Sequence, residues 1–324
     1  MSLKAIALIS GGLDSTLAAK VIKLQGIEIF GLAFITPFTH PQVERLAQNI
    51  GIKIELVDIS LEYLDLVKNP RFGFGKNMNP CIDCHIFMLK KAKEFIKTYE
   101  ASFIISGEVL GQRPMSQNKS TLIRIEKESG LEGLLLRPLS AKLLVPTVPE
   151  QEGWVNRSKL FDFSGRSRKL QIELAKKLGL DGFSQPAGGC LLTDPGFSKR
   201  LKDLLTNREE LDLDNIQLLK IGRHFRLSNQ AKLIIGRNQK ENEHLKNLAS
   251  RDEFILEPKE VPGPTGILKA QSVTQELLEL SASILARYCD NNNGEVYISI
   301  AGYRDNQIIR CPAQPKDTVA SLCI

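Results

Sequence analysis

Seven consecutive residues near the N-terminus combine two glycines, three hydroxyl side chains and a carboxylate, a set suited to binding phosphate. The residues with candidate roles are Ser10, Gly11, Gly12, Asp14, Ser15 and Thr16. Adjacent glycines allow a tight turn, and amides at the start of a following helix bind phosphate oxygens. Because a carboxylate repels phosphate, Asp14 is predicted to hold Mg²⁺ against the phosphates or to position a reacting group. The alternative is a simple strand-turn-helix connection in which Asp14 caps the helix.

Three cysteines form a second set of reactive side chains. Cys81 and Cys84 are three positions apart at the predicted start of a helix, where the helix dipole is expected to lower thiol pKa values. Cys190 follows the string Gln-Pro-Ala-Gly-Gly at 185–189, whose two glycines would let the backbone pack closely around a sulfur. We therefore expect the three thiols to converge.

Four interpretations of these cysteines compete. The first is a c-type haem attachment site, whose motif Cys-x-x-Cys-His is matched here through His85. Attachment of this haem needs an exported chain, and no signal peptide is visible. Zinc could be held by the pair together with His85 and Cys190. Three thiolates could instead hold three irons of a [4Fe–4S] cluster and leave the fourth iron open for sulfide. Without metal, one thiol could carry a persulfide while another resolves the disulfide.

A third polar segment, residues 106–117, follows another predicted strand and reads Ser-Gly-Glu-Val-Leu-Gly-Gln-Arg-Pro-Met-Ser-Gln. Gly107 and Gln112 are expected to contact the nucleotide, and Arg113 can neutralise phosphate charge. The alternative is a polar loop in which Ser116 caps a helix.

The first half of the chain alternates short apolar runs with amphipathic stretches that could position these segments. Strands are expected at 5–9, 27–35, 52–57 and 102–106, and helices at 14–24, 43–49 and 82–99. Repeated β-α units imply an α/β fold with a doubly wound parallel sheet, whose ligand site lies at the carboxyl ends of the strands. The Gly/Pro/Asn-rich stretch 61–80 is expected to form a long loop.

The pattern changes after Cys190, and a smaller C-terminal α+β domain is expected there. A length of 324 residues allows two hydrophobic cores. We place the boundary so that the domains are 1–207 and 208–324. In this part of the chain, helices are expected at 195–206, 239–248 and 274–288. Apolar and polar residues alternate as in strands at 217–227 and 232–237.

The overall composition is that of an ordinary folded protein, with 42% hydrophobic and 25% charged residues. Lys and Arg number 43 against 37 Asp and Glu, and the net charge of +6 is too mild to demonstrate a polyanionic partner. No apolar run approaches the roughly 20 residues of a membrane-spanning helix. We therefore expect a cytoplasmic protein without membrane association, whose six cysteines are reduced.

Several of these strings resemble one enzyme family. Residues 10–15 resemble the PP-loop of ATP pyrophosphatases, whose motif is Ser-Gly-Gly-x-Asp-Ser. Residues 106–117 resemble the Thr-Gly-Glu/Asp-x-x-Gly-Gln-x-x-Ser-Gln segment of the 4-thiouridine synthetase branch, from which Arg-Pro at 113–114 departs. Asn-Pro-Cys-x-x-Cys at 79–84 and Arg-Pro-Leu at 137–139 are similar to tRNA 2-thiouridine synthases. The resemblance covers roughly residues 1–200.

The resemblance implies ATP-dependent thiolation of a tRNA uridine. ATP would be cleaved between its α and β phosphates, AMP would be transferred to a uridine carbonyl oxygen, and sulfur would displace the AMP. Cys81, Cys84 and Cys190 would deliver the sulfur. The implied cofactors are ATP, Mg²⁺ and a [4Fe–4S] cluster on these cysteines, with zinc as the alternative. The implied partners are tRNA and a sulfur donor, either sulfide or a persulfide carrier, and a homodimer is a further expectation.

Two stretches are candidates for holding RNA. Residues 157–169 carry five basic groups and one acid with two interleaved phenylalanines, which suits phosphate pairing and base stacking, although both rings could equally lie in the core. Residues 234–245 and 260–264 resemble the Gly-Arg-Asn-x-x-Glu-Asn and Val-Pro-Gly pieces of the NFACT RNA-binding domain, over roughly residues 215–320.

Two other functions stay open: an AMP-forming ligase that amidates a small molecule and carries a structural zinc, and an RNA-binding protein without turnover.

Overall fold

The computed structural model describes residues 3–41, 43–180, 190–290, 294–302 and 306–324. Contacts divide the chain into two compact units, Met1–Thr193 and Asp194–Ile324. This division falls before the expected boundary at 207/208, because helix α8 (Pro195–Thr206) is tied to the second unit. Its Asp203 carboxylate pairs with Lys232 at 3.3 Å and also with Arg226.

The first unit is built on a five-stranded sheet in the order β3-β2-β1-β4-β5, and each of these neighbouring pairs is parallel. The strands are β1 (Lys4–Leu8), β2 (Glu28–Ile35), β3 (Lys53–Asp58), β4 (Phe103–Ile105) and β5 (Leu135–Leu136). The central strand β1 reads as a continuous apolar run, because both of its faces are covered by helices. The expected doubly wound α/β fold is confirmed.

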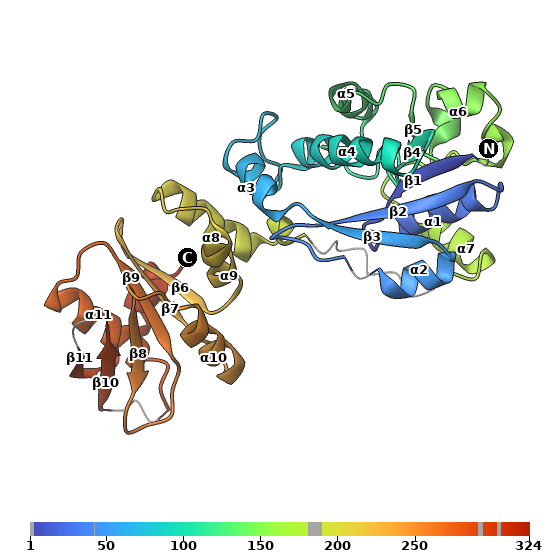
Figure 1. The fold of residues 1–324 in the computed structure, drawn as a ribbon. Coiled ribbons are helices and arrows are strands. Elements are labelled where there is room, and N and C mark those ends of the chain that lie inside the picture. The colour runs from blue at the N-terminus through green and yellow to red at the C-terminus, as the bar shows by residue number, and fades with distance from the viewer. Residues whose placement is uncertain (1–2, 42, 181–189, 291–293, 303–305) are drawn as a thin grey trace. The chain divides into compact units, whose positions relative to one another are not determined.

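Helices cover both faces of this sheet (Figure 1). They are α1 (Leu13–Lys23), α2 (Glu44–Ile50), α3 (Ser60–Lys68), α4 (Cys81–Thr98), α5 (Lys119–Ser129), α6 (Val148–Gln151) and α7 (Lys169–Lys177). Three short 3₁₀ turns lie at Ala141–Leu143, Arg157–Lys159 and Leu191–Thr193. Helices α1, α2 and α7 lie on one face, and α4 and α5 lie together on the other. On the first of these faces, Ala5, Ala7 and Ile9 share a buried core with Leu13 and Leu17 of α1.

One expectation for this unit is wrong. Residues 61–80 were expected to be a loop throughout, but α3 occupies Ser60–Lys68. The apolar residues Tyr63, Leu64 and Val67 bury one helical face, and the Gly/Pro/Asn-rich composition begins only at Asn69. The true loop is therefore residues 69–80.

The second unit is a six-stranded antiparallel sheet in the order β11-β10-β8-β9-β7-β6. Its strands are β6 (Arg223–Ser228), β7 (Ala231–Ile235), β8 (Phe254–Pro258), β9 (Gly266–Ala270), β10 (Glu295–Ala301) and β11 (Asn306–Pro312). Its other helices are α9 (Leu213–Lys220), α10 (Gln239–Leu248), α11 (Gln275–Ala286) and α12 (Lys316–Leu322). The expected α+β character is confirmed, although residues 217–220 are helical because Asp212 caps α9.

The two sheet faces of this unit have separate cores. Helix α11 buries Leu278 and Leu285 against one face, whereas Leu245 of α10 packs with Ile234 and Ile267 on a smaller cluster. The motif segments of the first unit follow the carboxyl ends of β1 and β4, which are neighbours in the parallel sheet. The ligand crevice of such sheets lies at that edge.

Candidate active site

The turn between β1 and α1 is shaped by its backbone. Gly11 adopts a φ of +81°, which favours glycine, and Gly12 is the extended N-cap of α1 without a side-chain cap. The hydroxyls of Ser15 and Thr16 donate hydrogen bonds to the Gly12 carbonyl at 3.0 and 2.9 Å. Ser10 and Ser15 lie 3.2 Å apart through their Oγ atoms. No side chain caps the helix start, and the interpretation of Asp14 as the cap is wrong.

Asp14 instead lies in the first turn of α1 and points toward other polar side chains. Gln112 Nε2 donates to its Oδ2 at 2.8 Å, and Arg168 Nη2 lies 3.4 Å from the same oxygen. Gln171 Nε2 donates in turn to Gln112 Oε1 at 3.3 Å. The other carboxylate oxygen, Oδ1, is buried and has no hydrogen-bond partner in the described structure. Buried polar atoms are nearly always paired, so this oxygen is a candidate ligand for a cation.

Arg168 is a site residue that the sequence analysis assigned to another role. It belongs to the stretch 157–169, considered above for RNA binding, yet its guanidinium lies beside Asp14. The rings of Phe161 and Phe163 contact each other in a tilted arrangement with ring centres 4.8 Å apart, Phe163 in the hydrophobic core and Phe161 packed against it. Arg157 pairs with Glu150. The core interpretation of this stretch therefore holds, and no local pattern could have paired two residues so distant in sequence.

Gly107 brings the β4 loop into contact with α1. A Cβ atom added there would lie 2.6 Å from the Asp14 carbonyl carbon and the Ser15 Cα, close also to the Ser15 amide nitrogen. The neighbouring Ser116 and Gln117 are buried, and Ser116 Oγ and Gln117 Oε1 have no hydrogen-bond partner among the described atoms. Asn118, rather than Ser116, caps α5. The polar atoms of this loop thus face the same region as Asp14.

We expect Gly107→Ala to lower the affinity for ATP at least tenfold, because the added methyl group must push the first turn of α1 out of place. Gly294→Ala in the second unit is the control, since its Cβ would meet no atom within 4 Å and ATP affinity should match the wild type. Equilibrium binding of a fluorescent ATP analogue measures both variants. Equal affinities for the two variants would contradict a close approach at Gly107.

The structure brings the three cysteines of the first unit together. Helix α4 begins at Cys81, and Asn79 Nδ2 donates to the Cys81 sulfur at 3.1 Å. The Cys190 segment is held by two contacts: Leu191 N donates to the Phe38 carbonyl, and Asn77 Nδ2 donates to the Thr193 carbonyl at 2.6 Å. The expected Gly-Gly support at 185–189 lies outside the described residues.

The electrostatics of these thiols differ from the expectation of a lowered pKa. Burial raises the pKa of the Cys84 thiol to about 12, although a hydrogen bond with Tyr63 opposes the rise and Cys190 and Cys81 add to it. Burial likewise raises the pKa of Cys190 to about 11, with a further rise from Cys81. Desolvation of the sulfur outweighs the helix dipole here. At neutral pH the buried thiols are protonated unless a cation or metal compensates the thiolate charge.

The donor set fits a three-thiolate metal group in residue type but not yet in spacing. Among the described residues, no three His, Cys, Asp or Glu side chains are arranged to hold a metal ion. His85, considered above as a zinc ligand, is hydrogen-bonded through Nδ1 to Glu108 Oε1 at 2.7 Å, which leaves Nε2 as its ring nitrogen for a metal. A cluster on these thiols would therefore require their side chains to move.

Glu108 joins the nucleotide loop to the cysteine helix through a buried ion-pair network. Besides His85 of α4, it contacts Arg137 Nε at 2.9 Å, and Arg137 also pairs with Glu126 at 2.8 Å. Burial alone would raise the pKa of Glu108, but Arg137 and His85 hold it well below its usual range. The Arg-Pro-Leu string of the sequence analysis thus has a structural role, because its arginine neutralises a buried carboxylate.

We expect Glu108→Gln to lower the free energy of unfolding by about 3–5 kcal/mol, because Arg137 would remain buried with a weakened partner set. Glu100→Gln, which breaks an exposed pair with Lys4, is the matched control and should leave the urea midpoint unchanged. The folded pKa of Glu108 is depressed, so its contribution is present above the ordinary value of about 4.3 and is lost as pH falls below it. If the free energy of unfolding changed with pH in the same way in the wild type and in Glu108→Gln, this role of Glu108 would be contradicted.

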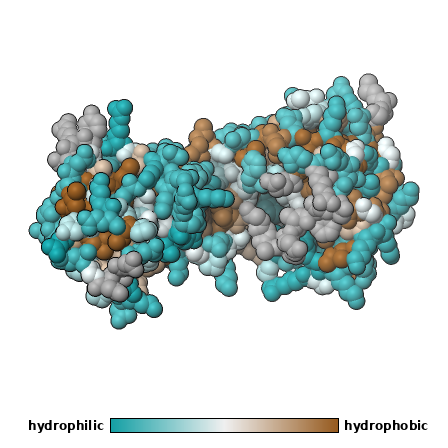
Figure 2. Space-filling view, turned by 90° about the horizontal axis from the view of Figure 1, so that it is seen from below, coloured by the Kyte–Doolittle hydropathy of each residue, from teal (hydrophilic) through white to brown (hydrophobic). Residues whose placement is uncertain are grey.

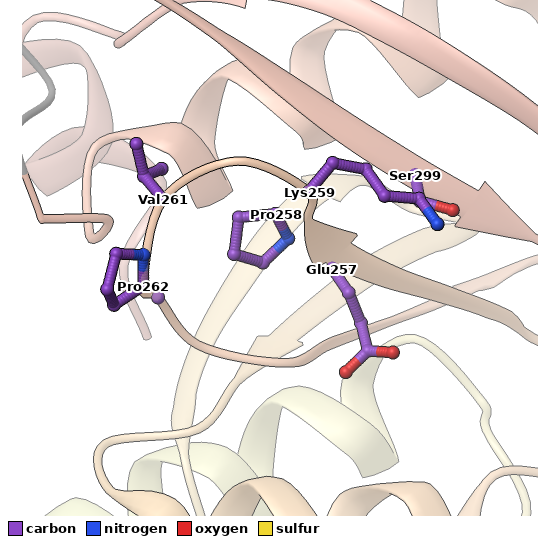
Figure 3. A pocket seen from close by; sticks show the side chains of 7 residues that line it. Glu257, Pro258, Lys259, Val261, Pro262 and Ser299 are labelled. Atoms are coloured by element: carbon purple, nitrogen blue, oxygen red, sulfur yellow. The ribbon is translucent and has the colours of Figure 1, made fainter.

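In the second unit, residues 236–245 make contacts that stabilise the start of α10 and the loop before β9. Asn238 caps α10, and Arg237 pairs with Glu241 at 2.6 Å. Asn242 Oδ1 accepts a hydrogen bond from Thr265 N at 3.2 Å, which fixes the end of the 260–264 loop against α10. That loop borders a cavity of about 310 Å³, and Figure 3 shows Glu257, Lys259 and Ser299 among its lining side chains.

Hydrophobic side chains on the surface do not gather into one large area on the face that Figure 2 shows. The face in Figure 2 is mostly hydrophilic, with hydrophobic side chains in separate patches. Among the described residues, no helix is both long and apolar enough to cross a bilayer.

Two family models match the chain in separate segments. The model of the thiamine biosynthesis protein ThiI matches residues 1–142, which contain the turn at Asp14, the Cys81–Cys84 pair and the Gly107 loop. The first unit is therefore similar to the ThiI family over these residues. The model of the NFACT protein RNA-binding domain matches residues 222–321, most of the second unit. Both resemblances of the sequence analysis are confirmed.

Individual proteins similar to the chain include enzymes named for tRNA thiolation. The tRNA-specific 2-thiouridylase MnmA of Petrotoga mobilis is 24% identical over 247 residues, covering 68% of this chain and 64% of that protein. A "Probable tRNA sulfurtransferase" of Thermococcus kodakarensis is 28% identical over 142 residues, covering 42% of this chain and 36% of that protein. The chain therefore spans less than two thirds of the length of these relatives.

Solved structures resemble the chain only distantly. A 4-thiouridine synthetase in complex with RNA and ATP has a TM-score of 0.34 and 20% identity, covering 54% of this chain and 51% of that one. The C-terminal part of a fibronectin/fibrinogen-binding protein from Streptococcus suis has a TM-score of 0.29 and 13% identity, covering 75% of this chain and 96% of that one.

Proposed function

We propose that the protein is an ATP-dependent tRNA uridine thiolase. The observation that carries the proposal is the Asp14 carboxylate, whose buried Oδ1 has no partner in the described structure, at the end of a parallel strand in a unit similar to the ThiI family. The names of the relatives, a 2-thiouridylase and a tRNA sulfurtransferase, support the substrate and reaction class.

The first step would be adenylation of the RNA. A uridine carbonyl oxygen attacks the α-phosphorus of ATP, and pyrophosphate leaves. In this proposal the amides of residues 11–16 and the hydroxyls of Ser10 and Ser15 hold phosphate oxygens, while Asp14 binds Mg²⁺. Arg168 would leave Asp14 to pair with phosphate when ATP enters, because its charge suits both partners.

The second step would replace the activated oxygen by sulfur. Sulfur attacks the uridine carbon, and AMP leaves with the former carbonyl oxygen. Cys81, Cys84 and Cys190 would hold a [4Fe–4S] cluster, which supplies an open iron able to bind sulfide. Three cysteines support a metal group, since a persulfide mechanism needs only one carrier thiol and one resolving thiol. A persulfide on one of these thiols is the competing mechanism.

The second unit would bind the tRNA. Its support is the match of residues 222–321 to an RNA-binding domain. We propose a cytoplasmic enzyme that draws its sulfur from sulfide or a persulfide carrier and acts as a homodimer.

Pyrophosphate release measured with and without tRNA tests this function. We expect release that depends on tRNA, together with a thiouridine detectable by mass spectrometry of the tRNA nucleosides. Release driven by a small carboxylic acid and ammonia without tRNA would indicate an amidating ligase. Binding of tRNA without any release would indicate an RNA-binding protein that has lost turnover.

A further inference from the structure

One face of the first unit carries cations and aromatic rings that the proposed chemistry does not use. Its residues come from the loop 69–80, the loop after β4 and helix α5. We call it the cationic-aromatic face, and it consists of Phe72, Phe74, Lys76, Arg113, Lys119 and Arg124.

The loop 69–80 contacts both other segments of this face: a Cβ atom added at Gly75 would lie 3.0 Å from Met115 Sδ in the loop after β4, and two further contacts join it to α5. Arg71 Nη1 pairs with Glu128 of α5 at 2.7 Å, and the Arg124 guanidinium lies 5.5 Å from the centre of the Phe72 ring. Both oxygens of Asp83 accept hydrogen bonds from backbone amides of the loop, at 3.1 and 3.0 Å. The loop 69–80 is therefore held on both α4 and α5, which lie together on one side of the sheet (Figure 1).

Cations outnumber acids on this face, where Glu128 pairs with Arg71 and Asp83 accepts hydrogen bonds from the loop backbone. Residues 69–80 contain two cations, residues 109–124 contain three, and neither segment contains an acid. The whole chain, by contrast, has 43 cations against 37 acids. Lys76, Arg113, Lys119 and Arg124 are exposed, and Phe74 is 37% exposed. The exposed Phe74 ring suits stacking of an unpaired base, and the cations suit phosphates, while the partly buried Phe72 packs against the guanidinium groups of Arg71 and Arg124.

The face borders the cysteine site. Its loop ends at Asn79, whose amide donates to the Cys81 sulfur, and Asn77 of the same loop holds the Cys190 segment through Thr193. Arg113 lies near enough for its charge to lower the pKa of Cys84 and Cys190. A strand lying on the face would therefore lead directly to the thiols.

We propose that the cationic-aromatic face binds a single-stranded segment of the RNA substrate, with phosphates on its Lys and Arg side chains and a base stacked on Phe74. This inference rests on the proposed thiolase function and adds where the target nucleotide is held. An acidic protein partner would use the cations but would gain little from the exposed ring.

The test uses the full chain and unmodified tRNA. The triple variant Lys76→Gln, Lys119→Gln and Arg124→Gln should reduce the slope of log affinity against log salt by about 2, since each lost single-strand phosphate contact contributes roughly 0.7. The triple variant Lys53→Gln, Lys97→Gln and Lys177→Gln, which removes exposed cations elsewhere on the first unit, is the matched control and should keep the wild-type slope.

Phe74 separates stacking from charge. Phe74→Leu should weaken tRNA binding about tenfold without changing the salt slope, whereas Phe74→Trp should keep wild-type affinity, because base stacking needs an aromatic face. ATP affinity and the thermal midpoint should match wild type in every variant, which shows that the fold and nucleotide site are intact.

The outcomes distinguish this face from the function itself. If the wild type thiolates tRNA and the face variants behave like the control variants, the face is refuted and the thiolase function stands. If the face variants bind tRNA like the wild type but no longer bind an acidic sulfur-carrier protein, the RNA-binding role of the face is also refuted. A wild type that neither binds nor thiolates tRNA refutes both proposals.

Discussion

Asp14→Ala is expected to reduce AMP and pyrophosphate formation by roughly 10²–10³, the scale seen when a preorganised charge of an active site is removed. Its Oδ1 is buried without a described partner, so the carboxylate has a place for Mg²⁺ that no other group in the described turn provides. The binding of ATP itself should change little, because Arg168 loses its competing partner and remains able to pair with phosphate. The effect should therefore lie in kcat rather than in KM for ATP.

Asp14→Asn is the sharper companion variant. It keeps an oxygen that can accept the hydrogen bond from Gln112 but removes the negative charge. A loss as large as in Asp14→Ala would show that charge, not the hydrogen bond, is needed. Unchanged pyrophosphate release in both variants, measured with an enzyme-coupled phosphate assay, would refute the PP-loop role of this turn.

Single replacement of Cys81, Cys84 or Cys190 by serine should abolish tRNA thiolation while pyrophosphate release continues. Each of the three thiols would hold one iron of the proposed cluster, and two thiols cannot hold it alone. The brown absorption of anaerobically purified protein should disappear together with thiolation. Exposure of the wild type to oxygen should remove both as well.

The second unit offers matched controls for these cysteine variants. Cys323 is exposed, whereas Cys289 and Cys311 are buried in the core beneath α11. Serine at any of these positions should leave thiolation and colour unchanged, although the buried pair should lower the thermal midpoint. Anaerobic wild-type protein that thiolates tRNA while containing zinc, or no metal, would refute the cluster and favour the persulfide mechanism.

Local patterns in the sequence were sufficient for most of the fold. Short apolar runs predicted β1, β2 and β4, because strands buried on both faces are largely apolar. The edge strand β3 is mostly exposed, but its apolar residues were still sufficient to predict it. Helix α3 was missed because residues 61–80 were treated as one loop on the basis of the Gly/Pro/Asn-rich residues that begin at Asn69. The apolar residues Tyr63, Leu64 and Val67 before them form the buried face of the helix. The boundary between the units was expected later in the chain, since the ion pairs that tie Asp203 to Arg226 and Lys232 leave no local signal.

The sequence by itself determined the residues able to do chemistry: the glycine turn with Asp14, the paired cysteines at a helix start and the loop with Gly107. Only the tertiary structure decided how they are combined. It placed Arg168 beside Asp14, joined His85 to Glu108 through a hydrogen bond, and raised the pKa values of the Cys84 and Cys190 thiols by burying them. Motifs are local because backbone turns and helix starts are local, whereas pairing and desolvation depend on neighbours that the chain brings from far away.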